Sequence, residues 1–144
     1  MSEGTERRSY IEDHRRAKRD AIAELGIVPF AYGFDRTHMA ADALAAWDDS
    51  MGETGPEVAV AGRIVSLRSQ GKTAFAHVED ATGRIQVYLR RDALADMWPL
   101  VELLDLDDHV GITGTLFRTR TGEVTVRATG VSMLSKALRP LPRG

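Results

Sequence analysis

The side chains with the most informative chemistry lie on two short runs of alternating residues, 73–80 and 84–91, joined by a tight turn. Alternation places Phe75 and His77 on one face of the first predicted strand, with small alanine side chains on the other face. On the second strand, Gln86 shares that outward face with a tyrosine and an arginine. Rings can stack on bases, an amide can read a base edge and arginines can bind phosphates. The pattern therefore predicts a surface that binds single-stranded nucleic acid.

Positive charge is concentrated in the same part of the chain, although the formal net charge is −2. Residues 58–91 and 110–144 together carry twelve basic side chains and three acidic ones. Acidic side chains gather instead in residues 35–57 and 92–109. Segregated charges create a local field even when the total is close to neutral. This distribution favours a polyanionic ligand for the strands, the alternative being that the strand arginines are simply solvated.

The order of predicted elements from residue 57 onward is three strands, one helix and two strands. Glycines at positions 62, 111 and 114 suit the curvature of a small closed sheet. This order matches the OB-fold, whose second and third strands and neighbouring loops bind oligonucleotides. We therefore predict a mainly β (α+β) protein, a five-stranded OB-fold barrel with a helix between strands 3 and 4 and a helical N-terminal extension. The expected strands are 58–68, 73–80, 84–91, 109–118 and 123–132, and the expected helix is 92–104.

The extension covers residues 1–56 and contains two predicted helices. The first runs over 8–25, with mixed charges, and is stopped by Gly26 and by the proline that follows at position 29. The second begins with Thr37 as its N-cap and ends near Trp47. An acidic linker follows and leads into the first strand.

Other chemistries find little support in the sequence. The four histidines lack the spacing of metal ligands, so no metal site is predicted. Asp105, Asp107 and Asp108 lack the EF-hand pattern and are expected to solvate a helix end. No catalytic constellation is recognised. No apolar run approaches the roughly 20 residues of a membrane span, and neither a signal peptide nor any cysteine occurs, so we expect a cytoplasmic location and no membrane partner.

Several motifs resemble the anticodon-binding domain of class IIb aminoacyl-tRNA synthetases. They are Gly62-Arg63-Ile64, Arg68, Gly71-Lys72, Phe75, Asp80, Gly83 and Ile85-Gln86. Within that group, the lysyl-tRNA synthetase family is the most similar. Its characteristic segments resemble residues 26–30, 37–38, 118–123 and 134–142 here, and the likeness runs from about Arg8 to Pro142.

The resemblance implies that Phe75 stacks on the central uridine of a lysine anticodon. It also implies that Arg68, Gln86 and Glu123 contact the edge of that base, where a carboxylate can accept the uracil imino hydrogen. A stacked base is worth roughly 1 to 3 kcal/mol. The structural alternatives are an exposed ring, a cross-strand amide and a surface pair between Arg68 and Glu123.

Five further residues have weaker expectations. His77 is expected either to stack on a neighbouring anticodon base or to face solvent. Lys72 and Arg120 are expected to hold phosphates from two loops. Trp98 is expected to be a core or lid residue, and Pro99 beside it marks a point where the predicted helix can break or restart.

The resemblance also implies a division of the chain into residues 1–56 (extension and linker), 57–135 (OB-fold) and 136–144 (the start of a linker to an absent catalytic domain). Catalysis by the ATP-dependent lysine–tRNA ligase would belong to that domain, so this chain alone is not expected to aminoacylate tRNA or to bind a cofactor, ATP and Mg²⁺ included. The expected partner is the tRNA-Lys anticodon stem-loop. The full-length enzyme would be a homodimer and the isolated domain can be a monomer. Two alternatives are a free-standing single-stranded nucleic-acid-binding module and an assembly domain that packs its N-terminal segments against another subunit.

Overall fold

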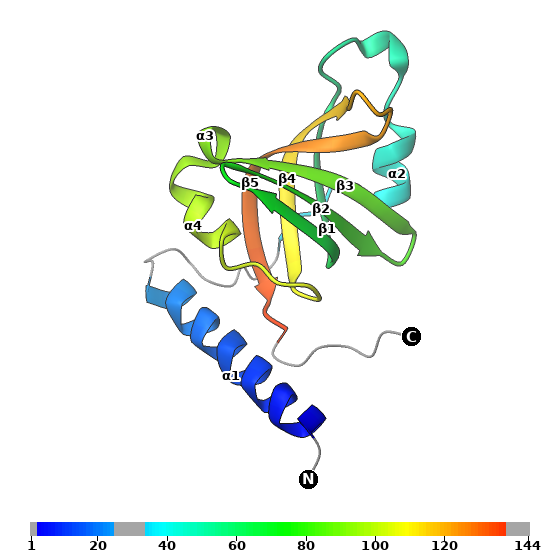
Figure 1. Ribbon diagram of the computed structural model, residues 1–144. Coiled ribbons are helices and arrows are strands. Elements are labelled where there is room, and N and C mark those ends of the chain that lie inside the picture. The colour runs from blue at the N-terminus through cyan, green and yellow to red at the C-terminus, as the bar shows by residue number, and fades with distance from the viewer. Residues whose placement is uncertain (1–2, 25–33, 138–144) are drawn as a thin grey trace.

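A closed five-stranded barrel forms the body of the protein (Figure 1), in the strand order β1-β2-β3-β5-β4. The structure is a computed structural model that describes residues 3–24 and 34–137. Helix α1 (Glu3–Glu24) lies outside the barrel, and α2 (Ala40–Ala45) packs against β1, β2 and β3. The predicted mainly β OB-fold with a helical extension is therefore confirmed. The strands are β1 (Glu57–Gln70), β2 (Thr73–Asp80), β3 (Gly83–Arg90), β4 (His109–Arg118) and β5 (Val124–Ser135).

Closure depends on a bent first strand and on one parallel pair. The first half of β1 pairs with β4 and its second half with β2, while β3 and β5 run parallel from Gln86 opposite Thr125. Two of the predicted curvature glycines lie where strands approach closely. A Cβ atom at Gly62 would collide with the Glu79 carbonyl, and one at Gly114 with the Arg127 carbonyl. Only glycine fits such close approaches of backbone to backbone.

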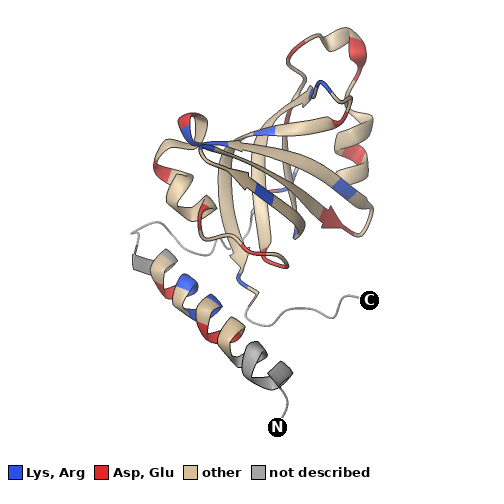
Figure 2. Ribbon diagram, in the orientation of Figure 1, with Lys and Arg blue, Asp and Glu red and all other residues tan. Residues whose placement is uncertain are grey.

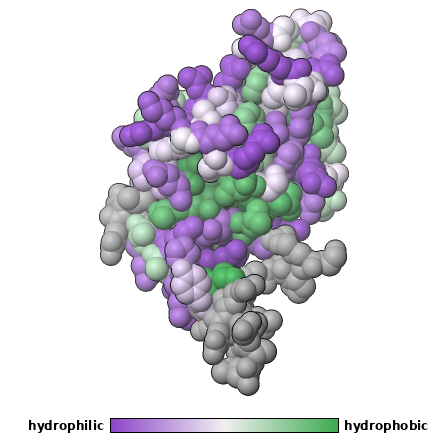
Figure 3. All heavy atoms as spheres, in the orientation of Figure 1, coloured by the Kyte–Doolittle hydropathy of each residue, from purple (hydrophilic) through white to green (hydrophobic). Residues whose placement is uncertain are grey.

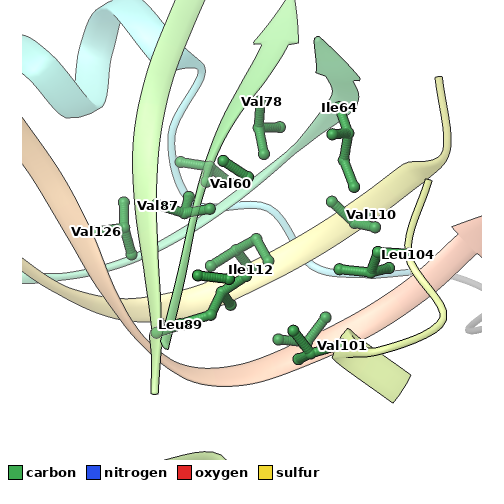
Figure 4. Packing of buried hydrophobic residues seen from close by; sticks show 14 of the residues in the cluster. Val60, Ile64, Val78, Val87, Leu89, Val101, Leu104, Val110, Ile112 and Val126 are labelled. Atoms are coloured by element: carbon green, nitrogen blue, oxygen red, sulfur yellow. The ribbon is translucent and has the colours of Figure 1, made fainter. Parts of the chain in front are cut away.

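Alternating apolar side chains fill the barrel (Figure 4). Successive strand residues point to opposite faces, so apolar side chains two positions apart share the core. Val87 and Leu89 of β3, for example, are almost fully buried, as are Val78 of β2 and Ile112 of β4. Figure 3 shows the outer surface, where hydrophilic residues surround a hydrophobic area in the middle of this face. The residues between the core rows are therefore free to form an outer, functional face.

The connection between β3 and β4 differs from the predicted continuous helix over 92–104. It consists of three short turns, α3 (Arg91–Leu94), η2 (Ala95–Met97) and α4 (Trp98–Val101). Two features break the helix: Ala95 has a φ of 48°, and Pro99 in the first turn of α4 cannot donate a backbone hydrogen bond. The break that Pro99 suggested is confirmed. Trp98 is buried in the core, as predicted.

Helix α2 begins later than predicted, and Thr37 is not its N-cap. The Thr37 hydroxyl instead accepts the Ala59 amide of β1 at 2.8 Å. The β2–β3 turn supplies the missing acceptors: Asp80 Oδ2 accepts the Ala40 amide at 2.7 Å and Thr82 Oγ1 the Ala41 amide at 3.0 Å. The hairpin that carries Phe75 therefore also fixes the start of α2. The predicted helix stop at Gly26 and Pro29, and the segments 26–30 and 138–142, lie outside the described residues.

The acidic residues before β4 do not solvate a helix end, contrary to the prediction. Asp107 and Asp108 are both buried. Arg63 Nη1 donates to Asp107 Oδ1 at 3.1 Å, and Lys136 Nζ donates to Asp108 Oδ2 at 2.7 Å. Arg63 belongs to β1 and Lys136 directly follows β5, so the ion pairs join the loop to distant parts of the barrel. Across residues 3–24 and 34–137, no helix is long and apolar enough to span a membrane.

Candidate nucleic-acid interface

One side chain from each strand contributes to a continuous row across the outer face of the barrel. We call this set the aromatic row, and its members are Arg68, Phe75, Tyr88, Phe117 and Arg127, from β1, β2, β3, β4 and β5 respectively. The rings of the middle three lie 4.7 Å and 6.1 Å apart between successive centroids. Each end carries a guanidinium, whose Cζ is 5.5 Å from the Phe75 centroid at one end and 4.3 Å from the Phe117 centroid at the other.

Strand register explains why these side chains meet. Arg68 is the cross-strand partner of Phe75, and Phe75 is the partner of Tyr88. Tyr88 in turn is opposite Arg127 in the parallel pair. Directly opposite residues on one face of a sheet are close enough for rings and cations to interact. The row thus combines flat apolar surfaces with fixed positive charge, as a single-stranded nucleic acid requires.

Two adjoining hollows border the row. The larger has a volume of about 430 Å³ and the smaller about 180 Å³. Both are lined by Arg68, Phe75 and Gln86. Tyr88, Phe117 and the β4–β5 turn (Thr119, Arg120 and Thr121) complete the larger hollow, whereas Ser66, Leu67 and His77 complete the smaller one.

Gln86 lies on the predicted face but is far less exposed than expected. Its residue exposure is 8%, and Nε2 donates a hydrogen bond to Thr125 Oγ1 at 3.0 Å. This contact is a cross-strand hydrogen bond of the amide, the structural alternative to base reading that the sequence analysis left open for Gln86. It arises because barrel closure sets Thr125 of β5 opposite Gln86. The amide is therefore held in one orientation at the wall that the two hollows share.

Glu123 and His77 are hydrogen-bonded to each other. His77 Nε2 and Glu123 Oε2 are 2.7 Å apart, and the other ring nitrogen of His77, Nδ1, is 2.7 Å from Ser66 Oγ. Glu123 pairs with His77 rather than with Arg68, which lies over the Phe75 ring instead. Both nitrogens of His77 are occupied, so its imidazole is not simply facing solvent.

The two side chains that are predicted to bind phosphates lie at different distances from the hollows. Lys72 and Arg120 are both exposed, in the β1–β2 and β4–β5 turns. Arg120 lines the larger hollow, whereas Lys72 is not part of either lining. In Figure 2, Lys and Arg residues lie on α1 and mainly on the strands and their turns, whereas Asp and Glu residues lie mainly on the helices and loops. The predicted charge segregation is thus visible in the fold.

Sequence reasoning missed four residues of this region: Ser66, Phe117, Thr125 and Arg127. Phe117 and Arg127 could have been found, because they flank the buried Leu116 and Val126 and must point outward. Arg127 Nε is also the one buried side-chain nitrogen or oxygen of the described residues without a hydrogen-bond partner. Thr125 also flanks Val126, but its burial against Gln86 depends on barrel closure. Ser66 gave no local signal, because the bulge in β1 decides its partner.

Comparison with known proteins agrees with this geometry. Residues 58–134 match the tRNA anticodon family model, described as "OB-fold nucleic acid binding domain". Curated relatives include lysine–tRNA ligases of Enterococcus faecalis (43% identical over 95% of this chain), Bacillus subtilis (38% over 99%) and Latilactobacillus sakei (44% over 89%). The chain spans 30%, 30% and 26% of the length of these relatives. The family match covers more than half of the chain, which therefore belongs to the tRNA anticodon family of OB-fold nucleic acid binding domains.

Proposed function

We propose that this chain binds the anticodon loop of tRNA-Lys and reads its central uridine, as the anticodon-binding part of a lysine–tRNA ligase. The observation that carries the proposal is the hollow between Phe75 and the β4–β5 turn, where a ring, an amide and a guanidinium meet. The similarity to lysine–tRNA ligases supports the choice of tRNA. Such a protein would act in the cytoplasm, where tRNA is aminoacylated.

Each side chain has a distinct role in this proposal. Phe75 provides the plane on which the base stacks. Gln86 has one amide hydrogen committed to Thr125, so its remaining hydrogen-bonding capacity faces the base. Arg68 donates to a base carbonyl or to a phosphate. Glu123 accepts the N3–H of uracil, whereas cytosine presents a bare N3 acceptor that a carboxylate repels.

The test is the affinity of this chain for a lysine anticodon stem-loop and for the same loop with cytosine in the central position. We expect uridine to be preferred by about ten- to a hundredfold, because cytosine leaves the carboxylate and its own N3 unsatisfied. Fluorescence anisotropy at one fixed salt concentration would measure both affinities. Equal binding would instead support a general single-stranded nucleic-acid module. If neither loop binds, the assembly domain becomes the better explanation.

Replacing the two turn cations should have a different effect from changing the base readers. We expect Lys72→Ala and Arg120→Ala to weaken binding to all loops alike, because phosphates carry no sequence information. Each should reduce the slope of log affinity against log salt by about one if the side chain neutralises one phosphate. Arg36→Ala is the control, since Arg36 is an exposed arginine whose charge acts near Asp80, beside α2. A changed preference between uridine and cytosine would contradict the proposed phosphate role.

A further inference from the structure

A chain of two hydrogen bonds runs from β1 through β2 to the β4–β5 turn. Ser66 Oγ is 2.7 Å from His77 Nδ1, and His77 Nε2 is 2.7 Å from Glu123 Oε2. The three residues are far apart in sequence, so the barrel itself brings them together. Ser66 and His77 also line the smaller of the two hollows.

A β-bulge in β1 places Ser66 in this chain. Ile64 pairs with Val78, so an unbroken register would set Val65 opposite His77. The register shifts between Ile64 and Ser66, and Ser66 becomes the partner of His77. Bulges are frequent beside functional sites, where the extra residue redirects a side chain. Here the bulge puts a hydroxyl rather than an isopropyl group beside the imidazole.

The proton positions follow from the chemistry of the three groups. An ionised carboxylate has no hydrogen to give, so His77 Nε2 must be the donor to Glu123. In a neutral imidazole, Nδ1 is then an acceptor, and Ser66 Oγ donates to it. The carboxylate thereby fixes the Nε2–H tautomer, much as a partner of one ring nitrogen fixes the role of the other. The hydroxyl, which can donate or accept, donates to Nδ1 and holds the ring in the orientation that reaches Glu123.

We propose that Ser66 and His77 are positioning residues that hold Glu123 for base reading. This inference rests on the proposed function. Oε2 of Glu123 is occupied by His77, and within residues 34–137 the carboxylate has no other hydrogen bond, so Oε1 is left for the uracil N3–H. Glu123 itself is exposed, on a turn after β4, and would otherwise lose rotamer entropy when the base binds. The Ser66–His77 pair removes that cost before binding.

The first experiment examines the hydrogen-bond chain without RNA. ¹⁵N NMR of the imidazole in the full chain should show the Nε2–H tautomer of His77. In Ser66→Ala, the ring loses the donor at Nδ1, so the Nδ1 signal should shift as a hydrogen-bonded nitrogen becomes an unbonded one, while Nε2 stays protonated by its contact with Glu123. A His77 ring in the Nδ1–H tautomer, or one that is unaffected by Ser66→Ala, would overturn the proposal.

The second experiment measures the preference for uridine over cytosine at the central position. We expect Ser66→Ala and His77→Phe to lower this ratio by about three- to tenfold, the equivalent of one hydrogen bond. His77→Gln should restore it, because its amide can accept from Ser66 and donate to Glu123, and Ser66→Thr should also retain it. Thermal unfolding of each variant would show separately whether the fold is intact.

The outcomes separate this proposal from the proposed function. A normal uridine preference that survives both Ser66→Ala and His77→Phe would overturn the positioning role and leave the proposed function standing. Lowered thermal stability with an unchanged ratio would mean that the hydrogen bonds only fasten the turn to the barrel. An unaltered chain that shows no preference would contradict the proposed function, and the positioning role with it.

Discussion

Phe75→Ala is expected to weaken binding of the lysine anticodon stem-loop by roughly 5- to 150-fold, because one stacked base contributes about 1 to 3 kcal/mol. Both hollows lose a wall in this variant, since Phe75 lines each of them. The free energy of unfolding should fall by only about 1 kcal/mol. The ring is half-buried, and its main aromatic contact is the stacked ring of Tyr88 at 4.7 Å. Affinity by anisotropy and unfolding by urea would give the two numbers.

Two matched variants show whether the aromatic plane is responsible. Phe75→Tyr keeps the plane and should retain most of the affinity, whereas Phe75→Leu keeps apolar bulk without a ring and should behave like alanine. Tyr10→Ala removes an exposed aromatic side chain from α1, outside the aromatic row, and should leave affinity unchanged. If Phe75→Ala instead lowers the free energy of unfolding by the roughly 3 to 5 kcal/mol typical of a buried phenylalanine, the ring belongs to the core and not to the interface.

The face that carries the site could be predicted because one side of each strand is buried. Ala74, Ala76 and Val78 point into the barrel, and this alone sends Phe75 and His77 outward. The same rule applies wherever apolar and other residues alternate strictly. It holds for β2 and β3 without any knowledge of the remaining strands.

Contacts across the closed barrel could not be predicted in this way. Gln86 is buried because β5 returns parallel to β3 and sets Thr125 opposite it, and the local pattern contains no sign of that return. The bulge that pairs Ser66 with His77 adds one residue to β1 without any glycine or proline to mark it. Ion pairs such as Lys136 with Asp108 join residues whose proximity depends on the complete fold. Local periodicity therefore predicts which face of the sheet carries the site. Which side chains of that face are fixed by hydrogen bonds depends on the tertiary structure.

The lysine that follows β5 is buried among carboxylates. Only 1% of the Lys136 side chain is exposed, and its Nζ donates to Asp105 Oδ2 at 2.6 Å, to Asp108 Oδ2 at 2.7 Å and to the Leu103 carbonyl at 2.9 Å. Asp105 also accepts from Lys18 of α1 at 2.9 Å, so one carboxylate joins the helix and the end of β5. Burial alone would raise the pKa of Asp105, but the hydrogen bonds and charges of Lys136 and Lys18 lower it below 3.8. The ionised carboxylate of Asp105 therefore stabilises the fold above about pH 3.8, and this contribution is lost on further acidification.

Lys136→Met is expected to destabilise the protein by about 3 to 5 kcal/mol. Methionine keeps the apolar stem but removes the charge. The carboxylate of Asp108, whose side chain is 0% exposed, then keeps only the backbone amides of Asp105 and Ala137 as donors and has no cation. Urea unfolding at neutral pH would measure the loss. Adding Asp108→Leu to Lys136→Met should recover only part of it. Leucine removes the buried charge, but the amides of Asp105 and Ala137 lose their acceptor.

An exposed ion pair of the same length provides the control. Arg118 Nη1 and Asp49 Oδ1 are also 2.7 Å apart, but the side chains are 48% and 70% exposed. Arg118→Met should lower the free energy of unfolding far less than Lys136→Met, since water screens the pair and solvates the remaining aspartate. Equal losses of unfolding free energy in Lys136→Met and Arg118→Met would contradict the importance of burial. The length of the ion pair would then determine its contribution. A large loss confined to Lys136 would show that the segment after β5 is fastened to the barrel by charge.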